Sequence, residues 1–127
     1  MGELGYGERF DGFEFDWFAV DADGQIGLFS SGGYGEIPAA VRSQFQAYDD
    51  VADQFELPNF GTEAVWQDYA PHGLYVYDWR HYSGPYIRKA TPTAEMSPEL
   101  RQQILQLPGL PRLGLLFVTT PRIVVPR

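Results

Sequence analysis

The stretch FDWFAVDADGQIGLFSSGGYGEIP, residues 15–38, contains the pattern that decides the fold. Aromatic and apolar residues alternate with other types over residues 13–20, which is the period of a β-strand. The DADG segment that follows has turn composition, because its glycine can adopt a positive φ. A second β-prone run occupies residues 25–29. The stretch therefore predicts a β-hairpin, then a glycine-rich loop, then a helix that begins at Pro38.

The remaining chain predicts two helices and more strands. Apolar residues at helical spacing predict an amphipathic helix over residues 38–55 and a shorter one over 98–106. Residues 63–69 fit either a short helical turn or a strand. Strand periodicity returns at residues 74–82 and 86–90, and β-prone runs close the chain.

These patterns together predict a single α+β domain over residues 1–127. We expect an antiparallel sheet of about five strands, packed against one long and one short helix.

Composition limits the classes of protein. The 127 residues are 44% hydrophobic, enough for a packed core. There is no cysteine, which excludes disulfides and thiolate sites. The first residues lack the pattern of a signal peptide, and the longest apolar run is too short to cross a bilayer, so we expect a cytoplasmic protein with no membrane role.

Charge is distributed unevenly. Residues 1–60 contain 12 acids and 2 bases, giving −10, whereas residues 61–127 contain 5 acids and 7 bases, giving +2. An acidic surface repels phosphate backbones, so we expect no nucleic-acid partner. It attracts a basic protein or another cation, although acidity that serves solubility alone would produce the same charge.

Two patterns resemble metal sites only in part. Asp21, Asp23 and Gly24 resemble the start of a calcium loop, but the third ligand before the glycine is missing and Ser30 stands where a glutamate is required. His72 and His81 do not have the spacing of metal ligands. We therefore predict a hairpin turn, with no metal and no cofactor.

The glycine-rich loop has several possible readings. It comprises Ser30, Ser31, Gly32, Gly33, Tyr34 and Gly35. A loop of this kind before a helix can cradle a phosphate, but no lysine follows and the GxGxxG spacing is absent. A catalytic triad could be assembled from either serine with His81, without the GxSxG motif that would support it. A plain link between strand and helix is the simplest interpretation.

Two further clusters leave alternatives open. Glu14 and Asp16 would lie on one strand face roughly 7 Å apart, which suits either an acid–base pair or solvent-facing acids. A second cluster is aromatic and comprises Tyr75, Tyr77, Trp79, Tyr82 and Tyr86, with Arg80 and Arg88 nearby. Such residues are typical both of protein interfaces and of cores.

The DWFAVDADG, IGLFSSGG and GEIP segments resemble the opening of a family of small bacterial proteins whose motifs have no known chemistry. The later GLYVYDW and PYIRKATPTAEM are similar to a second motif of that family. Some of its members are similar to immunity proteins of toxin–antitoxin and polymorphic-toxin systems. The resemblance implies a bacterial protein that binds another protein, and it implies no catalytic residue.

We therefore expect a non-enzymatic, immunity-type protein that binds a basic partner such as a toxin, as a monomer or homodimer. The predicted contact residues are Asp16, Asp21, Asp23, Asp49, Asp50, Asp53, Tyr75, Tyr77, Trp79 and Tyr82. The alternative is a small-molecule-binding or hydrolytic domain with a pocket at residues 30–35.

Overall fold

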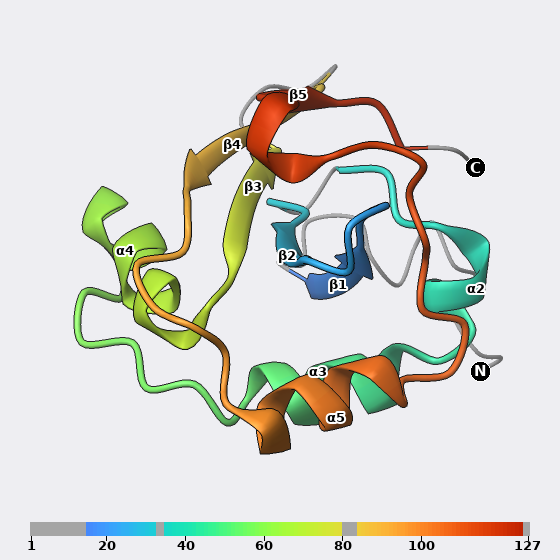
Figure 1. The fold of residues 1–127 in the computed structure, drawn as a ribbon, viewed down its shortest axis with the longest axis horizontal. Coiled ribbons are helices and arrows are strands. Elements are labelled where there is room, and N and C mark those ends of the chain that lie inside the picture. The colour runs from blue at the N-terminus through green and yellow to red at the C-terminus, as the bar shows by residue number, and fades with distance from the viewer. Residues whose placement is uncertain (1–14, 33–34, 80–83, 126–127) are drawn as a thin grey trace, which may run out of the picture.

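The five strands form one mixed sheet (Figure 1). The computed structural model describes residues 15–32, 35–79 and 84–125, which form a single α+β domain. In spatial order the strands are β1 (Asp16–Val20), β2 (Ile26–Ser30), β3 (Tyr75–Trp79), β4 (Tyr86–Ala90) and β5 (Arg122–Ile123). Neighbours pair antiparallel except β2 and β3, which are parallel. The prediction of a purely antiparallel sheet is therefore wrong at this central pair.

The parallel pair follows from the long connection between β2 and β3. Parallel neighbours require the chain to return to the starting end of the sheet, and such crossovers usually contain helix. Residues 31–74 make this return through α2 (Ala39–Arg42), α3 (Phe45–Ala52) and α4 (Trp66–Tyr69), which run from turquoise through green to yellow-green in Figure 1.

The predicted helix over residues 38–55 is two helices in the structure. The break falls at Ser43 and Gln44, where Gln44 has φ −127° and ψ 27°. The Ser43 hydroxyl donates to the backbone oxygen of Ala40, a local bond that competes with helix continuation. The prediction of one long helix is therefore wrong, although α2 and α3 occupy the predicted residues.

The start of the helix predicted over residues 98–106 is confirmed, and of the two alternatives left open for residues 63–69 the structure has the helical one. Residues 63–69 are helical, since a 3₁₀ turn at Glu63–Val65 leads into α4. Further 3₁₀ turns lie at Ala70–His72 and Phe117–Thr119. Helix α5 (Pro98–Leu105) begins as expected, with the Ser97 Oγ accepting from the Leu100 N–H at 3.2 Å. No helix among the described residues is both long and apolar enough to cross a membrane.

One face of the sheet, the aromatic face, carries a row of stacked rings. Trp17, Phe29 and Tyr77 are register partners on β1, β2 and β3. Their ring centroids lie 4.4 Å and 4.9 Å apart at interplanar angles of 17° and 8°. The C-terminal segment covers this row, because Phe117 packs 6.0 Å from Phe29 and 5.5 Å from Tyr77. Tyr86 meets the row edge-on.

Most of the described residues of the aromatic cluster belong to the core. Tyr75, Tyr77 and Tyr86 are buried and Trp79 is half-buried, while Tyr82 lies outside the described residues. The Tyr77 hydroxyl donates to the backbone oxygen of Thr120. Tyr77 is therefore a core residue that also ties down the C-terminal segment, and it offers no surface to a partner.

The buried tyrosines predict a loss of stability at alkaline pH. Burial raises the pKa of Tyr48 and of Tyr77 to about 12, although the neighbouring Arg88 lowers the pKa of Tyr77. An unfolded tyrosine ionises near pH 10, so above that pH the folded chain holds more protons than the unfolded chain. We expect the free energy of unfolding to fall as the pH rises from about 10 to about 12.

Tyrosinate absorbance and far-ultraviolet circular dichroism, followed together during an alkaline titration, check this expectation. Part of the tyrosinate signal should appear only as the fold is lost. In Tyr77→Phe the free energy of unfolding should fall less steeply as the pH rises. Complete ionisation near pH 10 in a chain that remains folded would contradict it.

Candidate functional site

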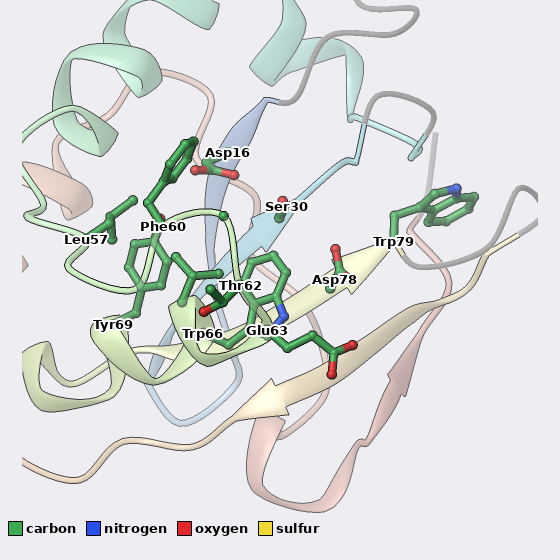
Figure 2. Close-up of a pocket in the computed structure, with 12 residues that line it drawn as sticks. Asp16, Ser30, Leu57, Phe60, Thr62, Glu63, Trp66, Tyr69, Asp78 and Trp79 are labelled. Atoms are coloured by element: carbon green, nitrogen blue, oxygen red, sulfur yellow. The ribbon is translucent and has the colours of Figure 1, made fainter.

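The opposite face of the sheet, the helical face, contains a pocket of about 480 Å³. It lies between the ends of β1, β2 and β3 and the segment from Leu57 to Tyr69 (Figure 2). This volume lies in the range of ligand-binding pockets. The predicted site residues Asp16, Ser30 and Trp79 line it.

The floor of the pocket is a polar row across three strands. Asp16, Ser30 and Asp78 are register partners on β1, β2 and β3, so their side chains share one face. Figure 2 shows the three side chains in a line above the strands. Neighbouring strands are about 4.8 Å apart, which separates the two aspartates by about 10 Å with Ser30 between them. Both aspartates are half-buried, and Ser30 is 5% exposed.

The wall of the pocket is apolar and comes from the crossover segment. Leu57, Val65, Trp66 and Tyr69 line it, the last two from α4. Tyr69 is buried and Trp66 is half-buried. An acidic floor facing an aromatic wall can hold a cation that also has an apolar part.

Hydrogen bonds fix the loop that forms the rim. The Asn59 side chain donates to Asp68 Oδ1 at 2.6 Å, and its backbone N–H donates to Oδ2 at 2.9 Å. Thr62 caps the following turn by accepting from the Ala64 N–H. Phe60 lies between these anchors and is 73% exposed, which is unusual for a phenyl side chain.

Glu63, at the rim, is the third acid of the described pocket lining. It is exposed and lines the pocket beside Thr62. No three histidine, aspartate or glutamate side chains of the described residues lie close enough to hold a metal ion. The pocket acids are therefore spread too widely to form a compact metal centre from these residues.

Among the described residues of the predicted loop 30–35, only Ser30 lines the pocket. Ser31 is buried, and its Oγ accepts from the Phe15 N–H at 3.0 Å. Gly32 has φ +61°, and a Cβ there would lie 2.8 Å from the Trp79 carbonyl oxygen. Gly35 is similarly crowded, with the Tyr86 hydroxyl 2.7 Å from a Cβ position. The loop is thus packed against the sheet in its described part, while Gly33 and Tyr34 lie outside the described residues.

Asp21 has a structural position rather than a surface one. It is 6% exposed, and its Oδ1 accepts from the backbone N–H groups of Asp23 and Gln25 at 2.9 Å and 2.8 Å. Its Oδ2 accepts from the Phe117 N–H at 3.0 Å. Asp21 therefore closes the hairpin turn and joins it to the C-terminal segment, so the contact role predicted for it has no exposed side chain to use. The neighbouring Asp23 is exposed.

The catalytic alternatives gain no support from the described residues. His72 is exposed and packs 5.1 Å from the Phe55 ring, and it is not among the pocket residues. His81 and Glu14 lie outside the described residues, so neither the triad nor the carboxylate pair can be placed.

Helix α3 presents a group of like charges. Burial raises the pKa of Asp49, and the charges of Asp53 and Asp50 raise it further. The repulsion of the Asp49 charge by these neighbours marks a region of negative potential. Leu57 of the pocket wall follows Asp53 by four residues in the chain.

This repulsion predicts that Asp49→Asn stabilises the fold slightly at pH 7. A carboxyl whose pKa is raised by folding binds its proton more tightly in the folded state, so its ionised form opposes folding at neutral pH. The gain should be at most about 0.5 kcal/mol, because the side chain is only partly buried. Thermal unfolding at pH 7 and near pH 4 checks this, since the gain should shrink at the lower pH. A destabilised variant, or an equal effect at both pH values, would contradict it.

The sequence did not indicate several pocket residues, namely Leu57, Phe60, Glu63, Trp66 and Asp78. Of these, only Asp78 stands out in the sequence, as an acid within an aromatic strand.

Comparison of the chain with protein-family models, with curated proteins and with solved structures finds no match. What the protein binds must therefore be inferred from the chemistry of the pocket and of the surface around it.

Proposed function

We propose that this is a non-enzymatic bacterial protein of the cytoplasm that binds a basic protein partner, as immunity-type proteins bind toxins. The contact surface is the acidic face, which we define as Asp16, Glu63 and Asp78 at the pocket together with Asp49 and Asp50 of α3 and Asp53 at its C-cap. The observation that supports it best is the pocket itself, which combines an acidic floor with a strongly exposed Phe60 at its rim.

The charge distribution supports the same proposal. Burial, and after it the charges of Asp53 and Asp50, raise the pKa of Asp49, and a cationic partner would relieve the repulsion from those two charges. Complementary charge raises association rates and opposes anionic competitors. The net charge of −8 adds a long-range attraction for a basic protein.

The test begins by capturing partners from the source cells at low salt with the intact protein as bait. A basic protein that is retained is purified, and its association rate is measured at rising salt with two variants of matched charge. Asp50→Asn with Asp53→Asn removes two negative charges from the acidic face. Thr119→Lys with Val124→Lys makes the same change of net charge at exposed residues of the C-terminal segment, which covers the opposite face.

We expect the first variant to slow association roughly tenfold at low salt, and the second to slow it much less. Rising salt should slow the association of the unmodified protein and reduce the difference in association rate between it and the first variant. Equal effects of the two variants, or association that does not respond to salt, would contradict the proposal.

A small-molecule-binding or hydrolytic domain is the second candidate. One observation favours it, since the Ser30 hydroxyl belongs to the pocket lining. Hydrolysis would also need a base beside that hydroxyl, and the described lining contains carboxylates but no histidine. Ser30→Ala should leave partner association almost unchanged if this candidate is correct, because the pocket would then serve another ligand.

A further inference from the structure

We infer that the pocket on the helical face receives one arginine side chain of the basic partner, with its guanidinium between Asp16 and Asp78 and hydrogen-bonded to Ser30. This inference rests on the proposed function, since it assumes a protein partner. It adds the residue type that is recognised and the atoms that recognise it.

Ser30 offers a hydrogen-bonding group to a ligand in the pocket. Its side chain is 5% exposed, and its hydroxyl makes no hydrogen bond with any residue that the structure describes. The hydroxyl opens onto the pocket and is not sealed in the core, since it is not one of the buried polar atoms without a partner in the described part of the chain. An N–H donor that enters the pocket can bond to this hydroxyl in place of water.

The acids on either side of Ser30 specify the charge of that donor. Asp16 and Asp78 flank the hydroxyl in register on the neighbouring strands, and Glu63 stands at the rim. Carboxylates accept hydrogen bonds and repel anions, so the ligand that fits is a cation with N–H groups.

The spread of the acceptors favours guanidinium over ammonium or a metal ion. A guanidinium presents five N–H donors in a plane, whereas an ammonium presents three from one point. The two aspartates stand about 10 Å apart along the row, with the hydroxyl between them. No compact group of three metal-binding side chains exists among the described residues. A flat, extended donor set matches this row best.

The aromatic wall suits the rest of an arginine side chain. Trp66 and Tyr69 line the pocket opposite the polar row (Figure 2). Arginine stacks its planar head on aromatic rings and buries its apolar stem against them. The same residue can therefore satisfy both sides of the pocket.

Phe60 indicates that the arginine belongs to a protein. Its ring is 73% exposed at the rim, while hydrogen bonds at Asn59 and Thr62 hold the loop on both sides of it. A free small molecule inside the pocket would leave most of this ring in water. A polypeptide that inserts one side chain would cover it with neighbouring residues, as aromatic contacts in protein interfaces are covered.

The test titrates the intact protein with the peptide acetyl-Gly-Arg-Gly-amide and follows binding by calorimetry. The same peptide with citrulline keeps the shape and removes the charge, and one with lysine keeps the charge and removes the planar donor set. Free arginine amide is titrated in parallel. We expect saturable binding of the arginine peptide with a dissociation constant on the order of 1 mM, at least about tenfold tighter than the citrulline peptide and tighter than the lysine peptide.

Variants assign the binding to the pocket. Asp78→Asn should weaken binding of the arginine peptide by about tenfold and Ser30→Ala by about fivefold, because each removes one acceptor. Phe60→Ala changes an exposed residue that the fold does not need, and it should weaken binding about threefold. Glu95→Gln is the matched control, because Glu95 is exposed and lies outside both the pocket and the acidic face, and it should have almost no effect.

Equal binding of the arginine and citrulline peptides, or unchanged binding by both Asp78→Asn and Phe60→Ala, would overturn the inference. Tighter binding of free arginine amide than of the peptide would also overturn it, because the pocket would then serve a small molecule. The outcome of the peptide titration does not determine the outcome of the association test with the whole partner. A partner whose association still depends on the α3 acids would support the proposed function even where the arginine inference fails.

Discussion

Phe29→Ala is expected to lower the free energy of unfolding by about 4 kcal/mol. Phe29 is fully buried at the centre of the aromatic face, stacked between Trp17 and Tyr77. Tyr86 and Phe117 also meet its ring edge-on. Removing the ring leaves a cavity among large rigid neighbours that cannot collapse to fill it. The loss of stability should therefore lie toward the upper end of the range for Phe→Ala substitutions in a core.

Urea unfolding followed by tryptophan fluorescence and circular dichroism measures this loss. Val124→Ala serves as the control, because Val124 is 84% exposed and its truncation should change stability by less than about 0.5 kcal/mol. A loss below about 1.5 kcal/mol for Phe29→Ala would show that the stacked row contributes far less than its burial indicates.

The second large effect is expected at Asp21, where alanine should lower the free energy of unfolding by about 3 kcal/mol. The substitution removes the acceptor of three backbone N–H groups, those of Asp23, Gln25 and Phe117. Two of these bonds close the hairpin turn, and the third crosses 96 residues to the C-terminal segment. Unsatisfied backbone donors at a buried site are costly, and water reaches the exposed part of the turn more easily than it reaches Phe117.

Urea unfolding of Asp21→Ala and of its neighbour Asp23→Ala gives the comparison. Asp23 is exposed, so its truncation should have little effect. Hydrogen exchange should also become faster at the Phe117 amide in Asp21→Ala alone. Equal stability of the two variants would contradict the structural role assigned to Asp21.

The parts of the fold that depend on neighbouring residues were predictable from the sequence. The β1–β2 hairpin follows from strand periodicity on both sides of a DADG turn, and Gly24 has the expected positive φ of 81°. Helix α5 follows from Ser97 and Pro98 at its start. In both cases a few adjacent residues determine the local backbone.

The parts that depend on distant pairing were not predictable. The parallel alignment of β2 and β3 is set by how residues 31–74 pack across the sheet, and strand periodicity is the same for both directions of pairing. The division between α2 and α3 depends on one serine side chain that bonds locally.

The pocket was not predictable from the sequence for the same reason. Asp16, Ser30 and Asp78 become neighbours only through strand register, although Ser30 and Asp78 are far apart in the chain. Turn acids are usually exposed, so the sequence predicts a surface position for Asp21, whereas its burial and its bond to the Phe117 N–H give it a structural one. Acids on a strand or turn thus need the tertiary structure before binding residues can be separated from structural ones.

The acidic face, which includes the pocket, is the binding surface that we propose. Amide chemical-shift mapping of the intact, isotope-labelled protein during titration with the arginine peptide tests it most directly. We expect the largest amide shifts at Ser30, Asp78 and the rim loop around Phe60, and we expect them to disappear in Asp78→Asn. Shifts confined to the C-terminal segment, or no shift that distinguishes the arginine peptide from the citrulline peptide, would contradict it.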